Sequence, residues 1–267
     1  MPERPRALTI AGSDSGGGAG IQADLKTFQA LGVFGTSAIT AVTIQNTTGV
    51  SGYEELSPKT VADQIRAVVT DIGVDAAKTG MLASASIVRA VADALAETEV
   101  PNLVVDPVSV SKHGHALLHG DAVDAIRTLI LPLATLVTPN LPEAGALVGF
   151  PVETDEDMRK AGEAILGLGA GAVLVKGGHL EDADAVDLLV TKDGAEPLSA
   201  ARIETLHTHG TGCVLSAAIT AHLARGATLG DAVREGKRFV TGAIAAAIPL
   251  GRGIGPVDPS WDLKTNT

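Results

Sequence analysis

Short apolar runs alternate along the chain with segments whose apolar residues recur every three or four positions. Residues 6–11 form the first run, and Ile21, Leu25, Phe28 and Leu31 then mark one face of a helix. The same alternation continues through the rest of the chain. It predicts strands at 6–11, 36–44, 75–78, 103–106, 135–138, 172–176, 185–191 and 198–203. It predicts helices at 21–31, from Pro58 onward, and at 86–98, 155–168, 212–225 and 231–247.

Strand–helix alternation of this kind is typical of an α/β fold. Parallel strands need crossover connections, and the helices in those connections cover both faces of the sheet. We therefore expect a three-layer α/β/α architecture around a mostly parallel, twisted sheet. The chain shows no internal repeat, low-complexity segment or linker, so residues 1–267 are expected to form a single domain.

Composition excludes several classes of protein. A hydrophobic content of 45% over 267 residues is too high for a disordered chain. The lone Cys213 cannot form an internal disulfide, and no Cys/His cluster has the spacing of zinc ligands. The first residues lack the apolar core of a signal peptide, and no apolar stretch reaches the ~18–20 residues of a membrane span. We expect a cytoplasmic protein.

Charge argues against a nucleic-acid partner. The chain carries 20 Lys and Arg against 31 Asp and Glu, a formal net charge of −11, and only 2% aromatic residues. It therefore repels a phosphate backbone and offers little surface for stacking bases. An anionic small-molecule substrate needs a local device instead, such as backbone amides, a metal ion or a well-placed lysine.

Chemically distinctive residues follow several of the predicted strands. The carboxyl ends of parallel strands meet at one edge of the sheet, where α/β proteins bind their ligands. Polar residues at these ends are therefore expected to line a single cleft. The strand ends are Gly12-Ser-Asp, Gln45-Asn46, Lys78-Thr-Gly, Asp106-Pro, Thr138-Pro-Asn and Lys176-Gly-Gly.

The segment His209-Gly-Thr-Gly-Cys213 precedes an apolar helix. Its two glycines allow the backbone N–H groups to face outward at the positive end of the helix dipole, which makes an anion site. An ordinary glycine-rich helix start, with Cys213 as a small core residue, is an equally good interpretation of the pattern alone. A thiol at a helix N-terminus is expected to have a lowered pKa, and this favours Cys213 as a proton acceptor.

The glycine-rich stretch at 12–20 does not fit a dinucleotide site. Its glycines at 16, 18 and 20 depart from the G-x-G-x-x-G spacing, and no acidic residue lies between Asp24 and Glu54 to bind a ribose. A Walker A loop is also missing, since the Gly236-Lys237 pair is followed by Arg.

Asp106 and Glu143 are the acidic residues best placed to hold a metal ion. Glu143 also fits a simpler role as a first-turn acid that stabilises a helix dipole. Lys176, at the end of an apolar strand, is expected to meet an anion, because burying an unpaired ammonium is costly. Together these residues suggest phosphoryl transfer without a Walker loop.

Five segments together resemble the hydroxymethylpyrimidine/phosphomethylpyrimidine kinase family of the ribokinase-like superfamily. The resemblance runs from Ala7 to Pro256. It is strongest at 7–16, 18–28, 138–144 (Thr-Pro-Asn-Leu-Pro-Glu-Ala), 173–179 and 209–213. It implies a ribokinase-like fold, commonly a homodimer, and two ATP-dependent phosphorylations. The first acts on 4-amino-5-hydroxymethyl-2-methylpyrimidine, and the second converts its monophosphate to the pyrophosphate used to build thiamin.

The resemblance also implies roles for individual residues. Gln45 is expected to hydrogen-bond the aminopyrimidine, and Cys213 to take the proton of the hydroxymethyl group. Asp106 would serve both Mg²⁺ and ATP. The other residues implied are Gly12, Asp24, Met81 and Val108 in the pyrimidine pocket, the amides of Gly210, Thr211 and Gly212 around the phosphoryl group, Glu143 at Mg²⁺, Lys176 and Asn140 at the ATP phosphates, and 251–256 near the nucleotide.

The sequence departs from the family pattern at a few positions. Ser109 stands where Met is usual, His113 where a small hydroxyl residue is usual, and Arg252 where His is frequent. These changes bear on substrate preference. Pyridoxal kinase activity, alone or in addition, is an alternative, because pyridoxal is also an aromatic nitrogen ring with a hydroxymethyl arm. A catalytically silent pyrimidine-binding module is a second alternative, although Asp106, Glu143, Lys176 and Cys213 are all present.

Overall fold

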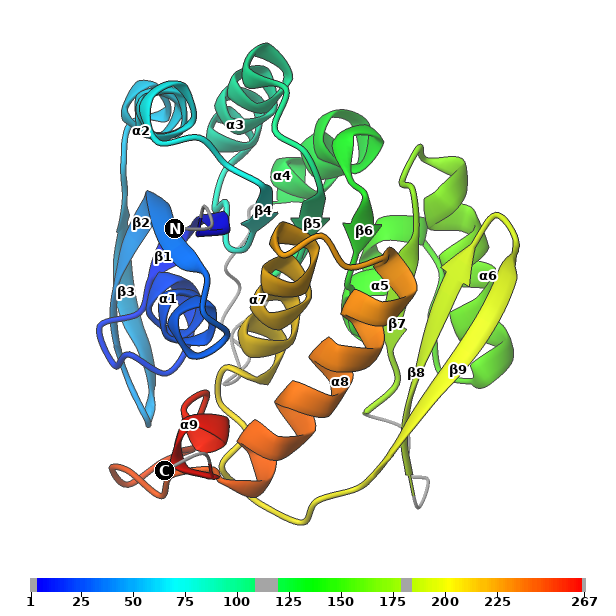
Figure 1. Ribbon diagram of the computed structural model, residues 1–267. Coiled ribbons are helices and arrows are strands. Elements are labelled where there is room, and N and C mark those ends of the chain that lie inside the picture. The colour runs from blue at the N-terminus through cyan, green and yellow to red at the C-terminus, as the bar shows by residue number, and fades with distance from the viewer. Residues whose placement is uncertain (1–3, 109–119, 179–183, 266–267) are drawn as a thin grey trace.

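The computed structural model describes residues 4–108, 120–178 and 184–265. These residues form one sheet in the order β3-β2-β1-β4-β5-β6-β7-β8-β9 (Figure 1). The strands from β1 to β7 other than β3 run parallel, whereas β3, β8 and β9 each pair antiparallel with a neighbour. The strands are β1 Arg6–Ser13, β2 Phe34–Asn46, β3 Gly49–Glu55, β4 Ala76–Thr79, β5 Leu103–Val105, β6 Leu136–Val137, β7 Val173–Lys176, β8 Asp184–Thr191 and β9 Gly194–Ala201.

Helices cover both faces of this sheet, which confirms the predicted three-layer α/β/α fold. In Figure 1, α1, α7 and α8 lie on one face, and α2 to α6 lie on the other. The helices are α1 Gly20–Ala30, α2 Pro58–Asp71, α3 Ala85–Thr98, α4 Gly120–Ala125, α5 Leu141–Val148, α6 Asp155–Gly167, α7 Thr211–Ala224, α8 Leu229–Ala245 and α9 Trp261–Thr265. Among the described residues, no helix is both long and apolar enough to cross a membrane.

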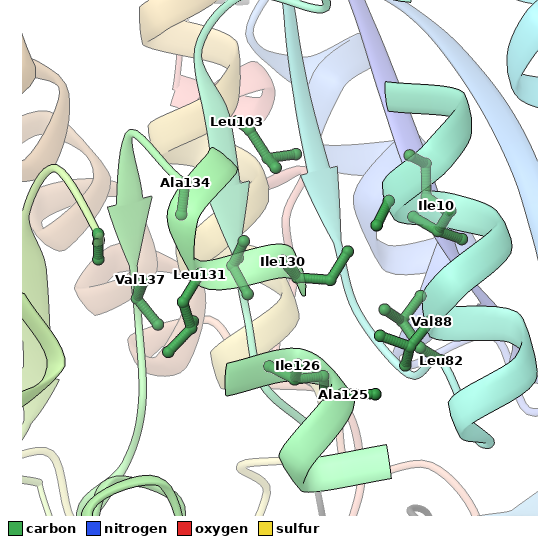
Figure 2. Packing of buried hydrophobic residues seen from close by; sticks show 14 of the residues in the cluster. Ile10, Leu82, Val88, Leu103, Ala125, Ile126, Ile130, Leu131, Ala134 and Val137 are labelled. Carbon is green, nitrogen blue, oxygen red and sulfur yellow. The ribbon is translucent and has the colours of Figure 1, made fainter. Parts of the chain in front are cut away.

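Two large clusters of buried apolar side chains hold the sheet and its two helical layers together. One lies between the sheet and the α2–α6 side, where Leu103 and Val137 of the strands pack near Ile130 and Leu131 (Figure 2). The other lies beneath α7 and α8 and includes Phe239. Burial of these side chains stabilises the fold in proportion to the apolar area removed from water.

Capping residues determine where several helices begin. The Ser57 hydroxyl accepts a hydrogen bond from the Thr60 N–H, and Pro58 occupies the first turn of α2. Reciprocal capping boxes begin α5 at Asn140 and α6 at Thr154. These starts fix the positions of the loops that precede the helices.

The structure adds elements that the apolar pattern does not predict. β3 has no buried residue and contains two glycines and two glutamates, so it carries little periodic signal. Residues 120–133 form α4 followed by a π-helical turn and a 3₁₀ turn. The strands predicted at 185–191 and 198–203 instead form the antiparallel ribbon of β8 and β9.

Candidate active site

A cavity of about 680 Å³ opens at the carboxyl ends of the parallel strands. Its walls come from the ends of β1, β2, β5 and β7 and from the start of α7. The residues expected in the site line it, except Asp24 and the segment 251–256. These lining residues are Gly12, Gln45, Met81, Asp106, Val108, Asn140, Glu143, Lys176, Gly210, Thr211, Gly212 and Cys213.

The start of α7 is shaped by a glycine in a left-handed conformation. Gly210 caps the helix with φ of 82°, and a Cβ at this position would collide with the Gly18 carbonyl oxygen. Because the first N–H groups of a helix lack partners within the helix, this start presents donors at the positive end of the dipole. It therefore suits a phosphoryl group.

Lys176 lies between two carboxylates at this helix start. Its ammonium Nζ is 3.0 Å from Asp106 Oδ1 and 3.8 Å from Glu143 Oε2. Burial works to lower the pKa of Lys176, but the two carboxylates outweigh it and raise that pKa well above its ordinary value. A Cβ on Gly212 would lie 3.4 Å from Nζ, which shows how close the ammonium is to the helix start. Lys176 is therefore a fixed positive charge beside the anion site.

Asp106 and Glu143 have the chemistry of magnesium ligands. Both are buried, with 2% and 5% of their surface exposed, and both offer the carboxylate oxygens that Mg²⁺ prefers. Within residues 4–108, 120–178 and 184–265, no group of three His, Cys, Asp or Glu side chains is arranged to hold a metal. The pair therefore fits an ion that also takes oxygens from water and from a bound phosphate.

Glu143 also serves the helix, as its simpler interpretation proposed. Its Oε2 accepts the Asn140 N–H at 2.9 Å, and the Asn140 Oδ1 accepts the Glu143 N–H at 2.9 Å. This capping box begins α5 and holds both side chains at the cavity wall. The helical and the site interpretations are thus compatible.

The expected lowering of the Cys213 pKa is wrong. Removal of the thiol from water, together with the nearby carboxylates of Asp24 and Asp106, raises the pKa of Cys213 to about 12. The positive Lys78 ammonium acts in the opposite direction but does not compensate. The helix dipole alone favours a lower thiol pKa, but desolvation is the larger effect here and raises it. Cys213 is therefore a neutral thiol in the resting protein.

Asp24 also differs from the expectation, because it lies behind the cavity wall. Its Oδ2 accepts hydrogen bonds from Thr9 Oγ1 at 2.6 Å and from Lys78 Nζ at 2.9 Å. Burial raises the pKa of Asp24 although Lys78 opposes the change. Lys78, rather than Asp24, reaches the cavity. Asp24 acts on the site through this ammonium.

The opposite end of the cavity has an apolar wall and one amide. A Cβ on Gly12 would come within 3.3 Å of the Met81 sulfur, so Gly12 leaves space against that side chain. Val108 and Met81 belong to one small apolar cluster. The Gln45 side chain completes this end with an amide that can both donate and accept hydrogen bonds.

Several lining residues were not assigned a role from the sequence. Asp14 and His209 form a pair with 3.0 Å between His209 Nε2 and Asp14 Oδ2. Asp187 and Lys237 form another, with 2.7 Å between the carboxylate and the ammonium. Lys78 was visible at a strand end, and His209 within a motif. Asp187 lies within β8 and Lys237 on α8, and the sequence carries no signal that these two residues meet.

The loop at 251–256 does not line the cavity. Two of its glycines pack on Thr47, where a Cβ on Gly251 or Gly253 would collide. The Ile254 N–H donates to the Thr47 carbonyl, and Pro256 pairs with His209. Arg252 is exposed on this loop, while Ser109 and His113 lie outside the described residues.

Two solved kinase structures superpose closely on this fold. The ADP complex of Bacillus subtilis pyridoxal kinase superposes with a TM-score of 0.92 at 41% identity, covering 98% of this chain and 99% of that chain. The phosphomethylpyrimidine kinase of Clostridium difficile 630 superposes with a TM-score of 0.81 at 45% identity, covering 90% and 100%. The fold and the site thus define a ribokinase-like phosphotransferase.

Sequence comparison identifies the family within this class of phosphotransferases. The hydroxymethylpyrimidine/phosphomethylpyrimidine kinase of Streptomyces coelicolor is 56% identical over 261 residues, which is 97% of this chain and 96% of the relative. A profile of the family described as phosphomethylpyrimidine kinase matches residues 14–258. The chain belongs to the phosphomethylpyrimidine kinase family. The expected kinase activity with ATP as co-substrate is confirmed.

Proposed function

We propose that this protein transfers the γ-phosphoryl group of ATP to the hydroxymethyl oxygen of 4-amino-5-hydroxymethyl-2-methylpyrimidine. A second transfer to the monophosphate then gives the pyrophosphate used in thiamin biosynthesis. The observation that carries this proposal is the position of Lys176 beside Asp106 and Gly212 at the start of α7, within one cavity that also holds Gln45.

The phosphoryl group is received at the start of α7. The backbone N–H groups of Gly210 to Cys213 surround its oxygens, and the Lys176 ammonium supports the charge that builds up during transfer. Asn140 lines the same cavity, and we expect it to contact the ATP phosphates. These groups are held by the fold before substrate arrives, so little rearrangement opposes the reaction.

Magnesium is expected at Asp106 and Glu143. The two carboxylates would hold the ion together with phosphate and water oxygens, and the ion would neutralise part of the phosphate charge.

Cys213 first releases its own proton to water, and the resulting thiolate accepts the proton of the hydroxymethyl group. The raised pKa makes this thiolate a minor species at neutral pH, but a strong base once it is formed. Lys78 supplies the nearby positive charge that favours the thiolate.

The pyrimidine ring lies at the end of the cavity formed by Gly12, Met81, Val108 and Gln45. An aminopyrimidine has a ring nitrogen that accepts a hydrogen bond beside an amino group that donates one. The Gln45 amide can meet both atoms. The apolar Met81 and Val108 surfaces suit the ring and its methyl group.

Pyridoxal is the second candidate substrate. The pyridoxal kinase of Bacillus subtilis shares the fold over nearly the whole chain. Pyridoxal also presents a hydroxymethyl arm on an aromatic nitrogen ring, so the same phosphoryl-transfer residues could act on it.

We further propose a cytoplasmic homodimer built from single-domain subunits. On β2, Thr43 and Gln45 line the cavity, while the alternate side chains of Val42 and Ile44 are 45% and 64% exposed. An apolar strand face of this kind suits contact with a second copy. Light scattering of the protein as it elutes from a size-exclusion column is expected to give twice the mass of the chain. The mass of a single chain would contradict the proposed dimer.

The test of the function is ADP release with Mg-ATP, offering the hydroxymethylpyrimidine and pyridoxal at equal concentrations in parallel. We expect faster turnover of the pyrimidine. Turnover of pyridoxal alone would support the kinase mechanism but show that the substrate is pyridoxal and not the pyrimidine. Absence of ADP with both compounds would contradict the proposal.

A further inference from the structure

The His209 ring lies buried between the side chains of Asp14 and Gln45. Its Nε2 is 3.0 Å from Asp14 Oδ2 and 3.4 Å from the Gln45 amide nitrogen. His209 and Asp14 are only 7% and 3% exposed, and all three residues line the cavity. The phosphoryl transfer proposed above uses neither Asp14 nor His209.

Asp14 is an ionised acceptor. Its carboxylate accepts the N–H groups of Gly16 at 2.7 Å, Gly18 at 3.0 Å and Ala19 at 2.8 Å. Burial opposes ionisation, but the hydrogen bonds from His209 and from this loop outweigh it and hold the pKa of Asp14 below its ordinary value. Because a carboxylate can only accept, the Nε2 atom of His209 must carry the hydrogen between them.

This hydrogen limits how the Gln45 amide can be oriented. A protonated Nε2 cannot accept a hydrogen bond from the Gln45 amide nitrogen. Its one hydrogen is directed mainly at Asp14, and the more distant Gln45 side chain can share it in a three-centre hydrogen bond only through its amide oxygen. Rotating the amide by half a turn exchanges its nitrogen and oxygen and places the oxygen next to His209. The histidine therefore favours the rotated amide.

Thr43 selects the same orientation from the other side. Its Oγ1 lies 3.0 Å from the Ser13 carbonyl oxygen and 3.1 Å from the Gln45 amide oxygen. The hydroxyl has one hydrogen, and the Ser13 carbonyl can only accept it. Thr43 then has only lone pairs for Gln45, and these require the amide nitrogen. The two neighbours thus agree on one arrangement.

The backbone around this network is held firmly. The Ser15 hydroxyl bonds both the N–H and the carbonyl of Gln45. The His209 N–H donates to Gly255, and its carbonyl accepts from Val257. A Cβ on Gly18 would lie 2.5 Å from the His209 ring, so the glycine allows the ring to pack against this loop. The segment at 255–257 therefore positions His209.

We propose that His209, oriented by Asp14, is a specificity-determining positioning residue that fixes which end of the Gln45 amide faces which part of the substrate ring. The inference deepens the proposed function, on which the substrate role of Gln45 rests. With its oxygen at His209 and its nitrogen at Thr43, Gln45 has one N–H and one lone pair left, in a fixed order. An aminopyrimidine needs this order, because a donor and an acceptor are adjacent on its edge. Pyridoxal has carbon on both sides of its ring nitrogen, so its binding depends less on this order of donor and acceptor.

Two substitutions separate this role from packing. His209→Leu keeps much of the bulk of the side chain and removes the donor, whereas His209→Gln places an amide N–H near the former Nε2. The matched control is His207→Leu, since His207 Nδ1 accepts the Gly255 N–H on the same loop without lining the cavity. Each variant is assayed with saturating Mg-ATP against the pyrimidine and against pyridoxal, after its melting temperature has been measured.

We expect His209→Leu to lower kcat/KM for the pyrimidine about tenfold or more, mainly through KM, the size of one lost hydrogen bond. The KM for ATP stays unchanged, and the preference for the pyrimidine over pyridoxal falls. His209→Gln recovers most of the preference, and His207→Leu retains it. An unchanged preference in folded His209→Leu would overturn the inference.

A second measurement decides the inference without turnover. Nitrogen-15 NMR of the histidine rings in the wild-type protein at neutral pH reports which ring nitrogens carry hydrogen. We expect hydrogen on His209 Nε2, and an unprotonated Nε2 would overturn the inference even if the pyrimidine is phosphorylated. A wild-type protein that fails to phosphorylate the pyrimidine would instead contradict the proposed function, leaving this NMR result to decide the orientation of the network.

Discussion

The Lys78 ammonium lies 2.9 Å from the Asp24 carboxylate, and neither side chain is exposed to solvent. The pair joins β4 to α1 beneath the cavity. Asp24 Oδ1 is buried without a hydrogen-bond partner among the described residues, so Lys78 provides the main compensation for this charge. The fold therefore depends on Lys78 as much as the site does.

Replacing Lys78 by Met is expected to lower the free energy of unfolding by about 3–5 kcal/mol, because it leaves the Asp24 charge buried and unpaired. Denaturant titration followed by circular dichroism measures the loss. The double variant Asp24→Asn, Lys78→Met removes both charges and should be more stable than the single Lys78→Met protein. A single variant as stable as the wild type would show that the pair contributes nothing.

Cys213→Ala is expected to reduce kcat by ~10²–10⁴-fold, because the variant lacks the proton acceptor. The KM for ATP should change little, since the backbone and Lys176 make the phosphate site. Steady-state kinetics with both substrates varied measures the two effects. Wild-type turnover in this variant would reduce Cys213 to a packing residue.

The raised thiol pKa predicts a distinctive pH dependence. Cys213 is the single cysteine of the chain, so alkylation by iodoacetamide reports its thiolate directly. Because the folded pKa is about 12, the rate should rise about tenfold per pH unit from pH ~7 to ~10 without a plateau. A plateau near the ordinary thiol pKa of ~8.5 would show that the pKa is not raised.

Lys176→Met is expected to reduce kcat by about 10²–10³-fold, the usual effect of removing one group that stabilises charge in the transition state. The effect should not depend on pH near neutrality, because the raised pKa keeps Lys176 charged there. Lys160→Met, on the exposed face of α6 with 57% of the side chain accessible, is the control and should leave kcat unchanged. Equal kcat values in the two variants would show that Lys176 does not contribute to the transfer step.

Gly210 and Gly226 provide a matched pair of substitutions at the two ends of α7. Both have left-handed φ values, 82° and 83°, but a Cβ meets the Gly18 carbonyl at Gly210 and open space at Gly226. Gly226→Ala should cost only the conformational penalty of about 1–2 kcal/mol. Gly210→Ala should cost more and also reduce activity, because the start of α7 must move. Thermal melts and kinetics of the two variants distinguish these outcomes.

The layout of the sheet could be predicted from the sequence because buried strands carry strong signals. Lys176 illustrates this, since an apolar run that ends in a lysine locates both the strand and the charge. β3 could not be found in this way, because an exposed strand needs no apolar face. The antiparallel direction of β8 and β9 was also hidden, since pairing direction leaves no local pattern.

The parts of the site that the sequence did not reveal depend on contacts between distant segments. Asp24 reaches Lys78 across 54 positions, and His209 reaches Asp14 across 195. The Cys213 pKa depends on desolvation and on carboxylates from α1 and the end of β5. The motif shows that this cysteine lies at a helix start but not what surrounds it, so the predicted direction of the pKa shift was wrong.

The most direct test of the proposed function is mass spectrometry of the pyrimidine after incubation with Mg-ATP and the wild-type protein. Samples taken over time are expected to show the monophosphate of 4-amino-5-hydroxymethyl-2-methylpyrimidine first and its pyrophosphate later, with one ADP formed per phosphoryl group transferred. An unmodified pyrimidine in the presence of active ATP turnover would contradict the account.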